Sequence, residues 1–119
     1  MYNSKVIDHF TNPRNMGEIE NPDATAQGGN PLCGDVVKLY LKVKDNKISE
    51  IKFKAFGCGA CIASSSALTE MIEGKSVSEA RKITNDDIVR YLGGLPEQKK
   101  KCSNFSADVL QKAIKELEK

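Results

Sequence analysis

The chain has 119 residues, of which 29% are charged and 6% aromatic, so we expect residues 1–119 to form one domain with an aliphatic core. The 18 Lys and Arg residues nearly balance the 16 Asp and Glu residues, which argues against a nucleic-acid-binding surface. The sequence has no apolar run that could span a bilayer and no secretory signal, so we expect a cytoplasmic protein with no membrane contact. In that compartment, its four cysteines indicate metal binding or redox chemistry rather than disulfides.

The N-terminal part predicts one short helix and then a long polar segment. Apolar residues have helical spacing over Tyr2–Phe10, and Asn12-Pro13 is expected to end that helix. The stretch 14–31 is rich in Asn, Gly and Pro, which predicts a loop with a short edge strand near 25–27. His9 is the only histidine and has no neighbours at ligand spacing, so we interpret it as structural.

The middle of the chain predicts an antiparallel β-hairpin. Apolar and polar residues alternate from Gly34 to Lys44, the period of a half-buried strand, and alternate again over 51–55 after a turn at Asp45-Asn46. Cys33 enters the first strand and Cys58 follows the second. The hairpin therefore brings both cysteines to the same end of the sheet.

The second half of the chain predicts helices. The first expected helix runs from about Ala60 to about Gly74, and a second, short helix begins at a capping box in Ser76–Glu79. A third is expected from Thr84 to Gly93, and a last one from about Phe105 to Leu117. Cys58 then lies just before a helix N-terminus, where the helix dipole favours a thiolate, and Gly57 and Gly59 supply backbone freedom for the turn. A charged connector from Glu97 to Lys101 is expected to place Cys102 at the N-terminus of the last helix.

Three cysteines thus lie where helices or strands begin or end, and Asp35 lies two residues after the first of them. Residues two apart on a strand point to the same face, so Cys33 and Asp35 can reach one site. With Cys58 and Cys102 they form a four-ligand set for a tetrahedral metal or an iron–sulfur cluster. The spacing matches no compact zinc finger, and the alternative for Asp35 is a solvated residue at the start of a strand.

Several segments in the same order resemble one known family, the iron–sulfur cluster scaffold proteins of the IscU/NifU N-terminal type. The matching segments are 5–10, 12–15, 33–36, 56–59 and 62–66. The resemblance implies an α+β fold in which helices pack mainly on one face of a three-stranded antiparallel sheet.

The resemblance also implies a function. Cys33, Asp35, Cys58 and Cys102 match the positions that bind a nascent [2Fe–2S] cluster in such scaffolds, which are not enzymes. These proteins receive sulfur as a persulfide from a cysteine desulfurase and pass the finished cluster to apo-acceptor proteins. A homodimer is compatible with this role. A carboxylate among thiolates is a harder, weaker ligand toward iron, which suits a cluster that must leave.

The chain departs from the family pattern at three places. Lys101 replaces the histidine that commonly precedes the last cysteine, and a protonated lysine is not a metal ligand. The segment 95–99 reads LPEQK in place of the chaperone-recognition motif LPPVK, so handover through an Hsp70-type chaperone is less well supported. Cys61 stands where relatives usually carry a small residue without sulfur. It is either a spare thiol that parks sulfur or a buried small side chain, and we favour the second.

Two other functions were weighed against the scaffold. A zinc-binding structural module would use the same three thiolates and carboxylate, and zinc could substitute for iron. A dithiol oxidoreductase would use Cys58 and Cys61 as a C-x-x-C motif, but no βαβ pattern surrounds the motif and two thiols would have no role. The lysines at 99–101 either stabilise the Cys102 thiolate or form an ordinary solvated surface.

Overall fold

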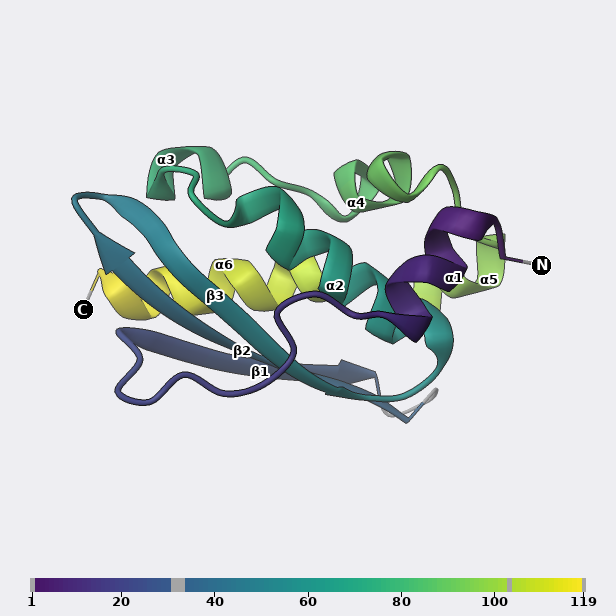
Figure 1. Ribbon diagram of the computed structural model, residues 1–119, viewed down its shortest axis with the longest axis horizontal. Coiled ribbons are helices and arrows are strands. Elements are labelled where there is room, and N and C mark those ends of the chain that lie inside the picture. Colours follow the sequence, from purple (N-terminus) through teal and green to yellow (C-terminus); the bar gives the residue numbers. More distant parts are fainter. Residues whose placement is uncertain (1, 31–33, 103, 119) are drawn as a thin grey trace.

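The computed structural model describes residues 2–30, 34–102 and 104–118. Three antiparallel strands form a sheet in the order β1-β2-β3. The strands are β1 (Ala24–Asn30), β2 (Asp35–Lys44) and β3 (Lys47–Phe56). The helices are α1 (Ser4–Thr11), α2 (Gly59–Ile72), α3 (Val77–Ala80), α4 (Asn85–Leu92), α5 (Glu97–Cys102) and α6 (Ser106–Leu117). Helices α2 and α6 pack along one face of the sheet, and α3 and α4 lie beyond them (Figure 1), which confirms the predicted α+β fold.

The β2–β3 hairpin forms as the alternation predicts. Its apolar positions, such as Leu39, Leu41 and Phe53, are fully buried under the helices. Asp45 and Asn46 have φ values of 54° and 63°, the left-handed conformation that a two-residue hairpin turn with the right twist requires. The antiparallel register places the start of β2 opposite the end of β3. Asp35 therefore lies beside the chain that leaves β3 toward α2.

The first strand is longer than predicted, because its glycines have a low strand propensity. β1 covers Ala24–Asn30 and pairs with β2 along its whole length, whereas the sequence predicted an edge strand only near 25–27. A Cβ atom added at Gly28 would lie 2.8 Å from a methyl group of Val109 in α6. The glycines of β1 thus let α6 approach the sheet closely, a packing requirement that strand propensity does not reveal.

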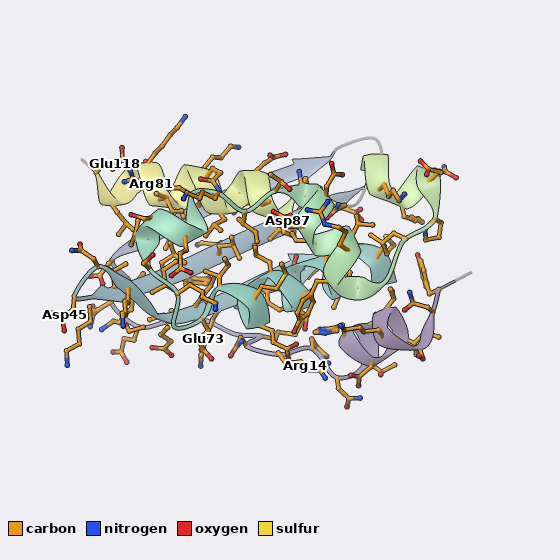
Figure 2. All side chains as sticks on the ribbon, turned by 90° about the horizontal axis from the view of Figure 1, so that it is seen from above. Arg14, Asp45, Glu73, Arg81, Asp87 and Glu118 are labelled. Carbon is orange, nitrogen blue, oxygen red and sulfur yellow. The ribbon has the colours of Figure 1, made fainter. Side chains whose placement is uncertain are left out.

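Helix α2 is the central helix of the fold, and nearly every residue from Ala60 to Thr69 is buried. Its small side chains let it lie between the sheet, α1, α4 and α6. The buried hydroxyls at 65 and 66 are hydrogen-bonded: Ser65 Oγ lies 2.9 Å from Ser106 Oγ, and Ser66 Oγ lies 2.8 Å from His9 Nδ1. At the far end of the molecule, Arg81 forms an ion pair with Glu118 (Figure 2), which links the end of α3 to the end of α6.

His9 fastens α1 to α2, in agreement with the structural role predicted for it. The side chain is buried, Nδ1 contacts Ser66, and Nε2 lies 3.6 Å from Glu70 Oε1. The imidazole edge also packs against the Tyr91 ring, with centroids 6.2 Å apart. Burial lowers the pKa of His9, and the positive charge of Arg14 lowers it further.

Among the described residues, the helices are too short or too polar to cross a membrane.

We expect the folded protein to lose stability as the pH falls below 6.5, the ordinary pKa of the imidazole. Above that pH His9 is neutral in both the folded and the unfolded chain, and its contribution is complete. Below it the unfolded chain takes up the proton first, so the free energy of unfolding falls until the folded form is protonated as well. Urea denaturation between about pH 7.5 and pH 5.5 should show this loss, and His9→Gln should weaken it. The hydrogen bond from Arg14 holds the pKa of the neighbouring Asp8 carboxyl below its ordinary value, so Asp8 stays ionised over this range. An equal pH dependence in the variant would contradict the assignment.

Candidate functional site

Cys58 lies at the point where the chain leaves the sheet and enters α2. It is the N-cap of α2, with φ −75° and ψ 170°, and the first turn begins at Gly59. The chain turns at Gly57, whose φ of 149° is unfavourable for any residue with a side chain. This confirms the predicted position of Cys58 before a helix N-terminus.

Asp35 contacts Cys58 at this junction. Its Oδ1 accepts a hydrogen bond from the Cys58 backbone N–H at 3.1 Å, and its Oδ2 lies 3.9 Å from Cys58 Sγ. The residue is only 1% exposed, so the alternative of a solvated residue at the strand start is wrong. The sequence could not show this burial, because it depends on the chain that returns over Asp35 after β3.

The missing side chain at Gly57 makes room for this carboxylate. A Cβ atom added there would lie 2.1 Å from Asp35 Oδ1 and 2.8 Å from its Cγ. The carboxylate is kept in the junction by the N–H at the start of α2, where the helix dipole also favours a negative charge. Gly59 has a different role from the one predicted. It is the first residue of α2, and its lack of a side chain leaves room for the Phe10 ring, which a Cβ atom would approach to 3.3 Å.

Helix α5 lies next to this junction and supplies a positive charge. The negative charge of Cys58 and then that of Tyr2 raise the pKa of Lys99, and a hydrogen bond with Cys58 and the charge of Asp35 add smaller contributions. The sequence did not single out this pairing. Of the other lysines in the helix, Lys100 Nζ lies 3.1 Å from Glu97 Oε1.

The segment 97–101 is a helix and not the predicted connector. The Pro96 carbonyl accepts hydrogen bonds from the N–H groups of Lys99 and Lys100, which closes the first turn of α5. A proline before a helix with an acidic first residue is a start signal that the run of charges concealed. Cys102 therefore ends α5 instead of standing at the N-terminus of α6, which begins at Ser106.

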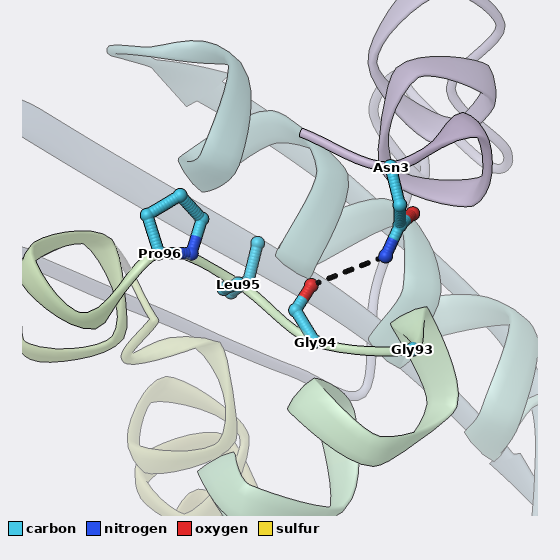
Figure 3. Close-up of a pocket in the computed structure, with 5 residues that line it drawn as sticks. All are labelled: Asn3, Gly93, Gly94, Leu95 and Pro96. Carbon is cyan, nitrogen blue, oxygen red and sulfur yellow. Dashed lines mark hydrogen bonds between the residues drawn. The ribbon is translucent and has the colours of Figure 1, made fainter. Parts of the chain in front are cut away.

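Asn3 connects the N-terminus to the segment that leads into α5. Its Oδ1 accepts the N–H of Val6 as the N-cap of α1, and its Nδ2 donates to Leu92 O at 3.0 Å and Gly94 O at 3.5 Å. Asn3 lines a pocket with residues 93–96 (Figure 3). This contact holds α1 and the approach to α5 together at the end of the molecule where α2 begins (Figure 1).

The structure brings together two of the four predicted ligands, Asp35 and Cys58. Cys33 lies outside the described residues, and so does the side chain of Cys102, although its backbone ends α5 beside the junction. Within the described residues no three Cys, His, Asp or Glu side chains form a metal-binding group. The complete four-ligand set therefore stays a prediction.

Cys61 is buried in the core, one turn along α2 from Cys58. Its side chain has no exposed surface, and burial raises the pKa of its thiol to about 12, with the charges of Asp35 and Cys58 adding to the shift. Its burial agrees with the interpretation of Cys61 as a small core side chain. An enclosed thiol with a raised pKa is a poor resident metal ligand.

Two exposed aromatic side chains flank Cys58, and the sequence analysis did not identify either of them as part of the site. Phe56 is 76% exposed at the end of β3, and Phe10 is 43% exposed on α1 above Gly59. Phe10 continues the apolar spacing of the first helix, which does not mark an exposed position. The alternation over 51–55 instead places Phe56 on the same face as Lys52 and Lys54, so its exposure could have been read from the sequence. The junction thus combines a thiol, a carboxylate and an ammonium group beneath a partly apolar rim.

The protein shares its fold with proteins of known structure. A NifU-like protein (N-terminal) from Brucella abortus superposes with a TM-score of 0.83 at 22% identity, covering 98% of this chain and 93% of that one, which shows a shared fold. A putative iron–sulfur cluster assembly scaffold protein for the SUF system from Fervidobacterium islandicum superposes at 0.79 with 25% identity, covering 95% of this chain and 96% of that one.

The chain belongs to the NifU-like N terminal domain family, whose match covers residues 1–119. The iron–sulfur cluster assembly scaffold protein IscU 1 of Archaeoglobus fulgidus is 57% identical over 114 residues, 96% of this chain and 74% of that protein. The scaffold protein IscU of Aquifex aeolicus is 48% identical over 117 residues, 97% of this chain and 74% of that protein. The resemblance carried by the cysteine motifs is thereby confirmed.

Gly57→Ala should destabilise the protein more than Gly74→Ala does. Both glycines have positive φ, but only the new methyl group at 57 collides with Asp35, whereas a Cβ atom at 74 meets nothing within 4 Å. We expect an extra cost of roughly 1–3 kcal/mol in the free energy of unfolding, measured by urea denaturation. Equal losses in the two variants would show that the carboxylate is not held against residue 57.

Proposed function

We propose that this protein is a scaffold on which an iron–sulfur cluster is assembled and from which it is passed on. The observation that carries the proposal is the pairing of Cys58 with a buried Asp35 at the mouth of α2, in a chain whose relatives are named as cluster assembly scaffolds. Residues 1–119 act as one scaffold domain. The cargo is a [2Fe–2S] cluster, which is built, held and released, and the protein itself catalyses no turnover of a substrate.

Three thiolates and one carboxylate hold the cargo in this proposal: Cys33, Cys58, Cys102 and Asp35. The described geometry supports one sulfur and one oxygen ligand from neighbouring elements, and α5 brings the backbone of Cys102 to the same end of the fold. Asp35 is the weakest ligand of the set toward iron, because a carboxylate is harder than a thiolate. An incoming acceptor thiol displaces it first.

The sulfur source in this proposal is a cysteine desulfurase, which delivers persulfide sulfur to the site, and the recipients are apo-acceptor proteins. Lys99 beside Cys58 stabilises the negative charge that accumulates when sulfur and thiolates gather at the junction. The exposed rings of Phe10 and Phe56 give partners an apolar surface beside the site. We further propose a cytoplasmic location, with the protein acting as a monomer or a homodimer. The altered LPEQK segment weakens the case for chaperone handover.

Anaerobic reconstitution with ferrous iron and sulfide tests the function. We expect iron–sulfide absorption, a [2Fe–2S] Mössbauer spectrum and retained iron after desalting. Cys33→Ser, Cys58→Ser and Cys102→Ser should each lose most of that iron, because each removes a thiolate ligand, whereas Cys61→Ser should keep the wild-type amount. A wild-type protein that retains only zinc, with no iron–sulfide absorption, would favour the structural zinc module. A Cys61 variant that loses iron like the others would overturn the ligand assignment.

Asp35→Ala should hold its cluster longer than the wild type in air or chelator, and should transfer it more slowly to an apo-ferredoxin. Three thiolates remain to bind the cluster, while the exchangeable ligand is gone. Decay of cluster absorbance with and without the acceptor measures both effects.

Asp35→Asn is the matched control for the fold, since its amide oxygen can still accept the Cys58 N–H. Urea denaturation of the two variants separates the loss of this hydrogen bond from the loss of the ligand. Faster cluster loss from Asp35→Ala in both assays would make Asp35 an anchor instead of a release point.

A further inference from the structure

We propose that Cys61 reduces sulfur held on Cys58, releasing it as sulfide and leaving a Cys58–Cys61 disulfide. The proposal rests on the proposed function, because it needs persulfide sulfur to arrive at Cys58. Such sulfur is at a more oxidised level than the sulfide in a cluster, so a scaffold needs two electrons for each atom it receives. The two thiols of the C-x-x-C segment can supply them.

The two cysteines occupy positions whose side chains can meet. Cys58 is the N-cap of α2 and Cys61 is the third residue of the helix, whose N–H donates to Cys58 O at 3.1 Å. In two other helices of this protein the N-cap side chain reaches the backbone N–H of the third helical residue, whereas the Cys58 side chain makes no such capping bond. Ser76 Oγ accepts from the N–H of Glu79 at 3.0 Å at the start of α3, and Thr84 does the same for Asp87 at the start of α4.

Bond formation requires a small adjustment of the backbone at the N-cap, because the two Cβ atoms have to come closer together. Side chains three residues apart on a helix have Cβ atoms about 5–6 Å apart, and a disulfide needs about 3.5–4.5 Å. Cys58 has extended backbone angles and is not part of the regular helix, so its side chain can turn over the first turn as other N-caps do. Both residues are reduced in the structure.

Burial decides which sulfur atom Cys61 attacks. Attack on the outer sulfur would move that atom onto Cys61, where a fully buried side chain in the core has no room for another sulfur. Attack on Cys58 Sγ forms the Sγ–Sγ bond instead and expels the outer sulfur toward the half-buried side of Cys58. The enclosed position of Cys61 therefore disfavours parking of sulfur and favours its release.

The step balances in atoms, charge and electrons. The persulfide anion Cys58–S–S⁻ and the thiol Cys61–SH give the disulfide Cys58–S–S–Cys61 and HS⁻. The bond between Cys58 Sγ and the outer sulfur breaks with its electron pair on the outer sulfur, and the thiol proton goes to that leaving sulfide. The sulfane sulfur gains two electrons and the two cysteines lose two. An external dithiol, itself oxidised to a disulfide, returns the pair to thiols before Cys58 can bind iron.

Intact-protein mass spectrometry with glutathione persulfide as the donor tests the step. The iron-free full chain is pulsed, desalted rapidly without added thiol, and followed by mass and by peptide mapping. We expect the wild type to release sulfide and lose the mass of two hydrogen atoms, with the disulfide mapped to Cys58 and Cys61. Cys61→Ala and Cys61→Ser should keep one extra sulfur on Cys58 for about tenfold longer or more.

A relocated thiol gives the matched control. In the double variant Cys61→Ala, Ser64→Cys the number of thiols is unchanged, but the second one lies a further turn along α2. Ser64 is buried and its Oγ has no hydrogen-bond partner, so the substitution breaks no hydrogen bond of that side chain. This variant should behave like Cys61→Ala, and circular dichroism confirms that each variant is folded.

Several outcomes would overturn the proposal. These are equal persulfide lifetimes in the wild type and Cys61→Ala, a disulfide between Cys58 and another cysteine, extra sulfur mapped to Cys61, or no sulfur on Cys58 in any variant. Reconstitution of Cys61→Ala with ferrous iron and inorganic sulfide bypasses the step. If Cys61→Ala forms a cluster in this reconstitution and any of the outcomes above is also seen, only the proposed role of Cys61 is refuted. If the wild type fails to form a cluster, the scaffold function itself is refuted.

Discussion

The hydrogen bond from the Cys58 N–H to the buried carboxylate of Asp35 joins the three parts of the fold on which the site depends. It ties the start of β2 to the end of β3 and to the first turn of α2. A buried carboxylate is costly unless its charge is compensated, and here the compensation comes from a helix N-terminus and a nearby ammonium group. The same contact fixes the thiol next to the carboxylate. Folding of the hairpin therefore assembles half of the predicted ligand set.

This contact is possible because a glycine lets a side chain approach the backbone closely, and such close approaches recur through the structure. Gly57 leaves space for Asp35, Gly59 for the Phe10 ring, and Gly28 for Val109. Small side chains on α2 have the same effect between the sheet and the outer helices. The fold thus requires small residues near Cys58, and a larger side chain at Gly57 or Gly59 would move Asp35 or the Phe10 ring.

The sequence was most informative where one periodicity or one motif determines the structure. The alternation in 34–44, the capping box of α3, the helix start at Thr84 and the turn at Asp45-Asn46 each act over a few residues, and each was confirmed. Contacts between distant segments were not predictable in the same way. The length of β1 depends on α6, and the burial of Asp35 depends on Gly57.

The prediction of a connector at 97–101, where the structure has α5, was wrong for a different reason. Five charged or polar residues, 97–101, resemble a solvated linker, and the decisive signal was the proline before them. The consequence concerns the site directly, because a helix fixes the direction of Lys99 and a linker would not. The cysteine motifs identified the family and the four candidate ligands. They could not show that a lysine of α5 interacts with Cys58.

The charges around Cys58 have to serve two states of the protein, one without cargo and one with it. Before assembly, the ammonium group of Lys99 and the positive end of the α2 dipole lie beside Asp35 and Cys58. When a cluster with thiolate ligands occupies the site, negative charge increases, and the same groups offset it without any rearrangement of the fold. In the proposed ligand set, a fourth thiolate in place of Asp35 would bind iron more firmly in the loaded state. A carboxylate that accepts a hydrogen bond from a backbone N–H keeps a partner when iron leaves. Release of the cluster therefore does not leave a buried charge without compensation. The pairing of Asp35 with the helix N-terminus thereby makes the empty state stable enough for the scaffold to be used again.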